Sequence, residues 1–515
     1  MNAAGTRRWW ALGAMSLAVL GAGLDATVLS LALPTLAGAL QATESELQWF
    51  VAGYALVLAA AMLPAGLLGD RYGRKTVMLT SLVLFGAGSI ACAAAPNAVA
   101  FIAARSVLGL AGAGLITMCL SLLTVLFTEE ERPRAVGVWS MANFLALPIG
   151  PLLGGWLLSQ YWWGWVFLIN VPLVVLTLIA VWMLVPESRA AARPGLDPLG
   201  VLSSSAGLTA VTYGLIQAGQ QGWGSASSLV PLAIGALLLL VFGLWERRLS
   251  RRPDGQPLVD VSLFGSRSFT WGTILAGVGV LAMFGVLFTM PQYFQAIDGV
   301  DAQIAGLRLL PLIGGLVLGA GLADRLATRS GAKVTVALGF LLLATGLGVG
   351  AATSVGSGNG FAAAWMAMCG AGMGLALATA ASGALVELSA ERSGVGSAVL
   401  QAVNKLGGPF GAAILGSVLN SAYQDRLRAA GFSAGASRQS VFAGVAVARQ
   451  LKSAALLDAV RGAFVAGMDS SLAVAAGFAV LGILLALAFL PRRKDALGAT
   501  GSNCVESAHE VGVPG

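Results

Sequence analysis

The chain has 515 residues, of which 57% are apolar and only 10% are charged, and its mean hydropathy is +0.83. So little polar surface excludes a soluble enzyme of this length and indicates an integral membrane protein. The net charge of +7 reflects how Lys and Arg are divided among the loops, so it does not indicate nucleic-acid binding.

Long apolar segments recur along the chain. A bilayer core of about 30 Å needs roughly 20 apolar residues per helix, and fourteen segments meet that length. They are residues 10–33, 46–67, 76–95, 99–122, 135–158, 165–185, 199–219, 229–245, 269–293, 302–323, 334–354, 361–386, 393–419 and 470–490. The sequence therefore predicts an all-α polytopic membrane protein with fourteen transmembrane helices.

The basic residues set the expected orientation. If the N-terminus is cytoplasmic, Lys and Arg gather in the inward segments, and the six short outward loops contain none. Positive charge near helix ends resists translocation, so we expect both termini in the cytoplasm. The long outward loop 420–469 carries charges of both signs, but long loops report orientation poorly. We leave open whether it forms a helical hairpin or a simple connector.

Span one holds an unusual carboxylate. Of the 23 carboxylates, only Asp25 falls well inside an apolar segment. A charge at membrane depth costs about 2.5–3.5 kcal/mol on insertion scales, so such a residue usually faces a cavity or a partner. Asp25 is thus the leading candidate for a proton carrier, with a purely structural hydrogen bond as the alternative. His509, the one histidine, lies in the tail, which removes histidine relays from consideration.

Arg105 in span four is the expected partner of Asp25. At a rise of about 1.5 Å per residue, Asp25 lies roughly 12 Å and Arg105 roughly 9 Å from the outer ends of their spans. Because the two residues reach similar depths, we expect Arg105 to stabilise the ionised carboxylate until substrate or water weakens the pair. The alternative is that Arg105 only extends outward to the interface.

The loop between spans two and three, GLLGDRYGRK at 66–75, is dense in glycine and charge. Glycine permits the backbone conformations of a tight turn, and basic residues hold such a turn at an anionic membrane face. The members expected to form and anchor the turn are Gly66, Asp70, Arg71, Gly73, Arg74 and Lys75. A simple positively charged anchor is the alternative interpretation.

Span five contains ALPIGPLLGG at 146–155, with its prolines and glycines crowded into under three turns: Pro148, Gly150, Pro151, Gly154 and Gly155. Residues four apart share one helix face, so small residues there let another helix approach closely, while prolines release backbone carbonyls. Gly315 and Gly319 in span ten have the same spacing and are a candidate counterpart.

The loop motif has a second, degenerate copy, GLADRLATRSGAK at 321–333, which joins spans ten and eleven. The two copies of the motif are eight spans apart. The chain therefore divides into two six-span units, with two additional spans between them. The predicted parts are an N-terminal six-helix bundle at 1–190, two inserted helices at 191–246, a cytoplasmic linker at 247–268, a C-terminal six-helix bundle at 269–494 with an extracellular loop at 420–469, and a disordered tail at 495–515. Two equivalent bundles can rock around a midplane site.

Several adaptable side chains are candidates for a substrate cavity: Trp49, Tyr54, Met283, Phe284, Phe288, Gln401 and Asn404. Aromatic and methionine side chains form apolar surfaces that accommodate varied compounds, although core and lipid-facing positions are common alternatives. The four cysteines have no paired spacing, and no nucleotide-binding loop is present in the sequence, so we expect no metal site, no disulfide framework and no cofactor.

These motifs together resemble the major facilitator superfamily, and the fourteen spans are similar to its drug:proton antiporter family, which includes quaternary-ammonium and dye exporters. LDATVLSLALP at 24–34 resembles that family's first-span signature, with Ser30 in place of asparagine. RSVLGLAGA at 105–113 is similar to the fourth-span motif, whose arginine is tied to proton coupling, although Leu108 replaces a commonly polar residue. The segment 66–75 resembles the loop motif that latches the two halves, which implies this role for Asp70, Arg71 and Arg74.

The segment 146–155 resembles the antiporter signature of exporters, with Ala146 in place of glycine, and this likeness favours export. WGWVFLINVP at 163–172 is similar to the family's sixth-span entry, with Gly164 in place of arginine. The resemblance implies a major facilitator fold in the bacterial inner membrane, acting as a monomer.

The implied activity is exchange of protons for small amphiphilic compounds, driven by the proton motive force. Monovalent cations or neutral antibiotics are favoured over dications, because spans nine to fourteen show no carboxylate well inside them. The alternatives are an exporter dedicated to one metabolite or self-made antibiotic, a proton-coupled uptake symporter, and a membrane enzyme. The last is disfavoured because no catalytic cluster is evident.

Overall fold

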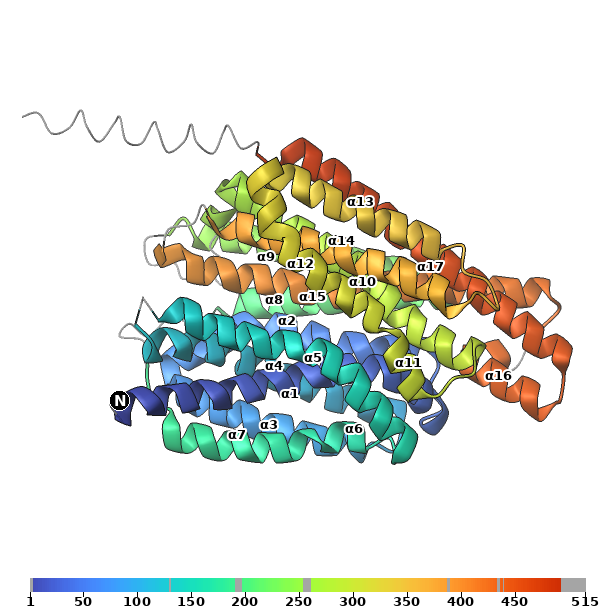
Figure 1. The fold of residues 1–515 in the computed structure, drawn as a ribbon, viewed down its shortest axis with the longest axis horizontal. Coiled ribbons are helices and arrows are strands. Elements are labelled where there is room, and N and C mark those ends of the chain that lie inside the picture. The colour runs from blue at the N-terminus through green and yellow to red at the C-terminus, as the bar shows by residue number, and fades with distance from the viewer. Residues whose placement is uncertain are drawn as a thin grey trace, which may run out of the picture.

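The computed structural model describes residues 3–128, 131–189, 197–252, 261–386, 390–432, 436–438 and 440–491. Within these ranges the chain forms long helices and no strands, as the apolar segments predict. Figure 1 shows the N-terminal helices, blue to teal, on one side of the bundle, and the C-terminal helices, yellow to red, on the other. The predicted tail 495–515 lies outside the described residues.

The N-terminal half contains α1 (Ala3–Ala39), α2 (Glu44–Tyr72), α3 (Arg74–Ala93), α4 (Ala98–Leu126), α5 (Arg132–Gln160), α6 (Trp165–Leu168) and α7 (Asn170–Leu184). The two inserted helices are α8 (Pro198–Gln221) and α9 (Ala226–Leu249). The C-terminal half contains η1 (Val261–Gly265), α10 (Arg267–Gln292), the π-helical turn η2 (Tyr293–Ile297), α11 (Ala302–Arg308), α12 (Leu310–Ser330), α13 (Ala332–Gly350), α14 (Asn359–Val386), α15 (Ala390–Ala429), η3 (Ala436–Arg438), α16 (Val441–Gln450) and α17 (Ala454–Phe489).

Twelve helical segments among the described residues are long and apolar enough to cross a membrane. The predicted spans 135–158 and 393–419, which are not among the twelve, fall in α5 and α15. These helices have 29 and 40 residues, but several of their side chains lie outside the described set. The number fourteen therefore stays a prediction.

The repeat of the loop motif has a structural counterpart. We call the end of the bundle where α1 begins the proximal end and the opposite end the distal end. At the proximal end, α2 and α3 are separated by Gly73 alone (φ 116°, ψ 129°), and α12 and α13 by Gly331 alone (φ 85°, ψ 153°). Both glycines have the positive φ that other residues rarely adopt. Gly66 was expected to share the turn, but it lies inside α2, because the helix continues through the motif to Tyr72.

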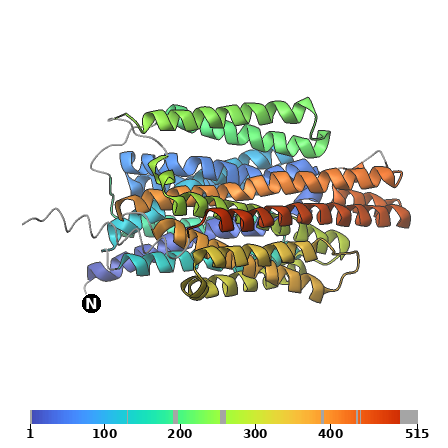
Figure 2. The same cartoon turned by 90° about the horizontal axis from the view of Figure 1, so that it is seen from above.

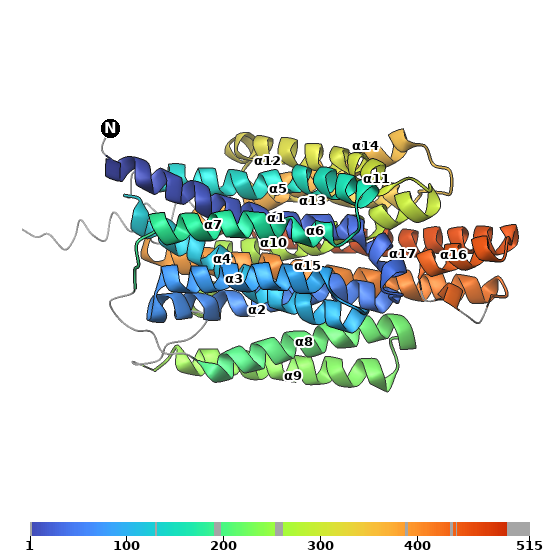
Figure 3. The same cartoon turned by 90° about the horizontal axis from the view of Figure 1, so that it is seen from below.

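The described residues of the segment 420–469 are mostly helical. Helix α15 continues to Ala429, α16 follows, and α17 begins at Ala454. Together they project past the rest of the bundle at the distal end (Figures 1 and 3). Tyr423 joins these pieces, because its hydroxyl donates to the carbonyl of Ser437 at 2.7 Å. Asp469, predicted to lie in this loop, is inside α17.

The inserted helices α8 and α9 form a tight pair along one side of the bundle (Figures 2 and 3). Helix α8 packs against α2 of the N-terminal half and α15 of the C-terminal half. Ser417 in α15 donates to the carbonyl of Leu215 at 2.5 Å, and Asn420 donates to the carbonyl of Gly219 at 3.1 Å. The pair thus lies across the line where the two halves meet.

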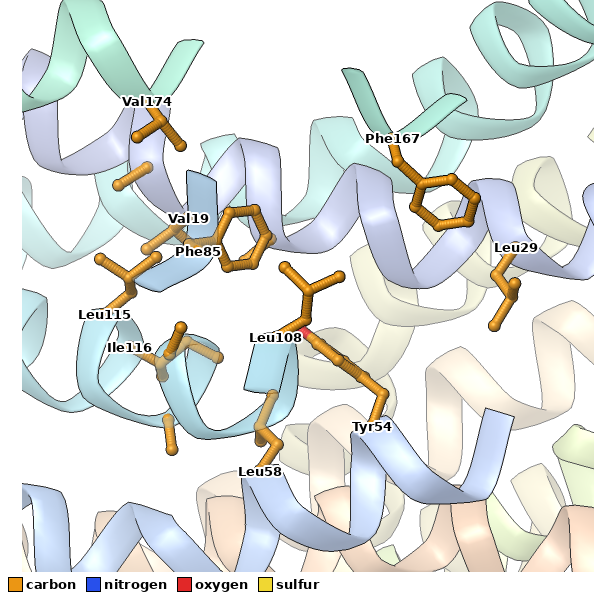
Figure 4. Packing of buried hydrophobic residues seen from close by; sticks show 14 of the residues in the cluster. Val19, Leu29, Tyr54, Leu58, Phe85, Leu108, Leu115, Ile116, Phe167 and Val174 are labelled. Atoms are coloured by element: carbon orange, nitrogen blue, oxygen red, sulfur yellow. The ribbon is translucent and has the colours of Figure 1, made fainter. Parts of the chain in front are cut away.

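The N-terminal half has a continuous apolar core between α1, α2, α3, α4 and α7. Figure 4 shows Tyr54, Phe85, Leu108 and Leu115 directed into this core, with Val174 above them. All are buried, and inside a membrane bundle such side chains hold the helices together by close van der Waals packing.

In the C-terminal half, α12 and α14 approach closely through glycine. A Cβ atom built at Gly315 would lie 2.1 Å from the carbonyl oxygen of Ala367, and one at Gly319 would lie 2.1 Å from that of Ala371. Gly315 and Gly319 therefore form a close crossing within their own half, against α14.

The neighbouring glycines Gly314 and Gly315 provide a matched test of this packing. Gly314 has open space around its Cα, so Gly314→Ala should stabilise the helix by up to about 1 kcal/mol through helix propensity. Gly315→Ala should destabilise the fold, because the added methyl group meets a backbone carbonyl that cannot move aside. Thermal unfolding in one detergent measures both variants. Equal effects would contradict the close helix crossing.

Candidate ion-pair site and the contacts between the halves

The structure brings Asp25 and Arg105 together as the sequence predicts. The Arg105 Nη1 atom forms an ion pair and a hydrogen bond with Asp25 Oδ2. Asp25 is 2% exposed and Arg105 is 1% exposed, so both charges are inside the N-terminal bundle. Arg105 is therefore not extended to the membrane interface. A buried pair of this kind is stable only when good geometry and further hydrogen bonds offset desolvation.

Other groups hold Arg105 in place. Its Nε donates to the carbonyl of Phe50 at 3.2 Å, and its guanidinium lies 4.4 Å from the centre of the Tyr54 ring. Cation–π contact with an aromatic face favours the charged form. Because Phe50 and Tyr54 are both on α2, Arg105 ties α4 to α1 and α2 at once.

Asn170 is a third member of the site. Its Nδ2 lies 3.5 Å from Asp25 Oδ1 and 3.4 Å from Ser89 Oγ. A cavity of about 10 Å³, large enough for one water molecule, lies beside it and is also lined by Thr177. Asn170 Oδ1 and Thr177 Oγ1 are buried and have no hydrogen-bond partner within the protein. Such a position fits a bound water on the α3 and α7 side of Asp25.

The glycines of span five pack on α1 beside Asp25. Cβ atoms built at Gly150 and Gly154 would lie 2.0 Å from Thr27 Oγ1 and 2.4 Å from Val28 Cγ1. The Thr27 hydroxyl also donates to the carbonyl of Ala146 at 3.2 Å. The close-packing helix predicted from 146–155 is thus present, and its neighbour is the helix that carries Asp25. The side chain of Pro148 lies outside the described residues.

The same segment contacts the C-terminal half. A Cβ atom at Gly155 would lie 2.7 Å from the backbone of Ala302 and Gln303, and one at Gly306 would lie 2.5 Å from the carbonyl oxygen of Pro151. Helices α5 and α11 therefore touch backbone to backbone at the distal end. Nearby, Gln295 Nε2 donates to the carbonyl of Leu31 at 3.2 Å. Any separation of the halves at this end must break these contacts.

The charged residues of 66–75 form local contacts at the proximal end. Arg74 donates to Asp70 Oδ1 through Nε at 3.0 Å and through Nη2 at 2.8 Å. Arg71 lies 5.6 Å from the ring of Tyr72, and the Lys75 ammonium donates to the carbonyl of Trp182 at 2.7 Å. The pairing of Asp70 within the motif agrees with the local pairing considered from the sequence.

Glu187, which the sequence reading missed, caps α3. Its carboxylate accepts from the backbone N–H groups of Lys75 at 3.1 Å and Thr76 at 3.2 Å, and from the Thr76 hydroxyl at 2.6 Å. Gly73, the cap residue of α3, has no side chain to bond these N–H groups. Burial alone would raise the pKa of Glu187, but hydrogen bonds from Thr76, Ser188 and Lys75 lower it.

The residues proposed for a substrate cavity fall into different surroundings in this conformation. Tyr54 stacks on Arg105, and Trp49 packs near Tyr213 of α8, with 6.4 Å between ring centres. Met283 belongs to the apolar core of the C-terminal half, whereas Phe288 packs into that of the N-terminal half with Phe284 against it. Gln401 and Asn404 are partly buried on α15. The structure does not gather the whole set around one cavity.

Among the described residues, no three or more His, Cys, Asp or Glu side chains are grouped so that they could hold a metal ion. The residues missed from the sequence are Asn170, Glu187 and the Phe50 carbonyl. Asn170 had a usable signal, because it is a lone amide in the apolar run of span six. Glu187 had none, since its partners, two backbone N–H groups and the Thr76 hydroxyl, are about a hundred residues earlier.

Comparison with known proteins agrees with this architecture. The sequence model of the Major Facilitator Superfamily matches residues 15–412. The multidrug efflux pump LfrA of Mycolicibacterium smegmatis is 31% identical over 482 residues, which cover 92% of this chain and 94% of that protein. The tetracenomycin C resistance and export protein of Streptomyces glaucescens is 29% identical, with 81% and 77% covered. The puromycin resistance protein pur8 of Streptomyces alboniger is 27% identical, with 98% and 95% covered.

Solved structures show the same fold. A bacterial homologue of the human lysosomal transporter Spinster, in an inward-facing and unoccupied conformation, superposes with a TM-score of 0.68 at 17% identity, and 93% and 96% of the two chains are covered. A D-xylose–proton symporter gives a TM-score of 0.60 at 15% identity, with 94% and 98% covered.

Removing one charge of the buried pair should be costly. Asp25→Asn leaves the Arg105 guanidinium buried without a counter-charge, and we expect a loss of about 3–5 kcal/mol in the free energy of unfolding. The double variant Asp25→Asn/Arg105→Gln should recover part of this loss. Unfolding in one detergent measures the coupling, with the exposed Asp324→Asn as control. If the double variant lost as much as the two single variants added together, the pair would not be coupled.

The Glu187 cap should depend on pH. Because its pKa is lowered in the folded protein, its stabilisation of α3 is present above the ordinary Glu value of about 4.3 and is lost as the pH falls through the lowered value. Hydrogen exchange of the Lys75 and Thr76 amides, corrected for intrinsic rates, should accelerate on acidification. Glu187→Gln should show no such acceleration. An unchanged acid response in that variant would refute the assignment.

Proposed function

The chain belongs to the major facilitator superfamily, and we propose that it is a proton-coupled antiporter that exports amphiphilic drugs across a bacterial cell membrane. One observation carries the proposal: α1, which carries Asp25 of the buried pair, packs against Gly150 and Gly154 of α5. The same segment of α5 contacts α11 of the other half through Gly155. A charge change at Asp25 and a movement of the halves therefore act on the same few helices.

The names of the relatives support export. LfrA is named a multidrug efflux pump, and the Streptomyces relatives are named for resistance to, or export of, tetracenomycin C and puromycin. We propose cargo of the same kind, with monovalent lipophilic cations or neutral antibiotics preferred. Phe284 and Phe288, which pack toward the N-terminal half from α10, and the amides Gln401 and Asn404 on α15 are the proposed cargo surface.

In the proposed cycle, the proximal end faces the cytoplasm, as the distribution of basic residues indicates, and all fourteen predicted helices cross the membrane. The contacts of α5 with α11 close the distal, outer end in this conformation. When the halves rock, Asp25 takes up a proton from outside, and its neutral form releases Arg105. After the return movement the proton leaves inward, while the cargo has left outward.

The water position beside Asn170 supports the carboxylate indirectly. Asn170 contacts Asp25 and lines the small cavity together with Thr177. A water held there has polar partners in both residues and fixes the amide that faces Asp25. The proton motive force supplies the free energy, so we propose no ATP, no metal and no other cofactor, and a monomer as the working unit.

A dedicated exporter of one compound is the second candidate function. It is favoured by the relatives named for a single antibiotic, tetracenomycin C or puromycin. A panel of dyes, quaternary ammonium compounds and antibiotics distinguishes the two, because a multidrug pump lowers the accumulation of many of them. An uptake symporter is disfavoured by the span-five signature. Accumulation of cargo driven by an inward proton gradient would support it instead.

The decisive test compares ethidium export by wild type and Asp25→Asn in energised vesicles, normalised to folded protein. The variant should lose export driven by a pH gradient, because its amide cannot carry a proton. It should retain ethidium exchange down a concentration gradient. Asp324→Asn, an exposed control on α12, should export as wild type does. If Asp25→Asn exports normally with the same pH dependence, Asp25 is not the proton carrier.

A further inference from the structure

A second carboxylate is as deeply buried as Asp25, although the sequence places it at a helix end. Glu44 is the first residue of α2 and is 2% exposed. Helix α2 packs here against α15 of the other half, where Gln48 meets Gly416, and the side chain of Gln292 from α10 lies nearby. Glu44 therefore lies where the two halves meet at the distal end. It is absent from the mechanism proposed above.

The surroundings of Glu44 have an excess of hydrogen-bond acceptors. Glu44 Oε1, Gln48 Oε1 and Gln292 Oε1 are all buried without a partner. Gln48 is one turn further along α2 and is 1% exposed, and Gln292 is fully buried. A buried acceptor left without a donor costs about 1–3 kcal/mol. A proton bound to the Glu44 carboxylate would turn one of its oxygens into a hydrogen-bond donor. That donor would then satisfy one of the unpaired amide oxygens.

No nearby group supplies that proton or a counter-charge. The Tyr423 hydroxyl from α15, which interacts electrostatically with Glu44, already donates to the carbonyl of Ser437. The other titratable and charged groups around this part of α2 are also engaged: Glu46 with Thr43, Arg105 from α4 with Asp25, Tyr213 from α8 with Gln217, and Tyr293 after α10 with the Ser354 carbonyl. No ion pair to Glu44 exists among the described residues. An ionised carboxylate buried in this way would be uncompensated.

We propose that Glu44 is a second proton-binding site, which takes up a proton when the halves close at the distal end and releases it when they separate. Closing transfers the carboxylate from water to the interface with Gln292, so the proton comes from solvent and becomes the O–H donor to a neighbouring amide oxygen. Opening rehydrates Glu44, and the proton returns to solvent. This role depends on the movement of the halves in the proposed function, but not on export itself.

The sign of the pH dependence follows from this exchange. Because closure takes up one proton, the ratio of closed to open molecules should fall as the pH rises above the ordinary Glu value of about 4.3. One linked proton changes that ratio by up to about tenfold per pH unit. Asp25 contributes its own dependence, so the test is the difference between variants that share Asp25.

Spin labels on the two halves measure closure directly. Trp156→Cys on α5 and Ile304→Cys on α11 are both exposed and flank the distal contact. In full-length protein carrying Cys504→Ser, the distance distribution between the labels gives the closed fraction from about pH 4 to about pH 8. Wild type should open as the pH rises. Glu44→Gln mimics the protonated side chain. The closed fraction of this variant should depend less steeply on pH, by up to one linked proton, and should stay higher than that of wild type.

Two controls keep the test specific. Glu46→Gln lies in the same turn, and glutamine preserves the capping box with Thr43, so it should follow wild type. Glu44→Asp keeps a titratable group and should retain the pH dependence. The proposal is overturned if Glu44→Gln has the wild-type pH dependence, or if Glu46→Gln changes it equally. Loss of ethidium export in Asp25→Asn does not bear on this result, so the two hypotheses fail separately.

Discussion

Two opposite charges inside an apolar bundle constrain the whole N-terminal half. Desolvating Asp25 and Arg105 costs several kcal/mol per ion, and their attraction offsets this only while both stay in contact. The Phe50 carbonyl, the Tyr54 ring and Asn170 complete the geometry from α2 and α7. Four helices are thereby held around one buried ion pair. In the proposed cycle, protonation of Asp25 removes the attraction and leaves Arg105 to find other partners.

Glycines on α5 connect this ion-pair site to the other half of the molecule through close backbone contacts. On α5, Gly150 and Gly154 let the backbone reach α1 two or three residues after Asp25, while Gly155 lets it reach α11. Small residues at these positions allow the helix backbones to approach closely. The segment 146–155 is thus a close-packed connection between α1 and α11. In the proposed function, this connection joins the ion pair to the movement of the halves.

The distal end has both close backbone contacts between the halves and a buried carboxylate. Backbone contacts of α5 with α11 lie there, and so does Glu44, which faces Gln292 across the interface. At the proximal end, the charges of 66–75 are bonded locally, as in Asp70 with Arg74, and Glu187 bonds the start of α3.

The sequence alone predicted the helical membrane fold, the repeated halves and the pairing of Asp25 with Arg105, because hydropathy, motif spacing and membrane depth are properties of single segments. It also predicted the close packing of span five, but not its neighbours. The sequence could not show that Gly66 is helical, that Gly315 packs on α14, or that Asn170 joins the ion pair. Glu44 is the clearest case: next to polar residues at a helix start it looks exposed, and only the approach of α10 and α15 buries it. Such contacts join residues far apart in the chain, so the tertiary structure alone decides them.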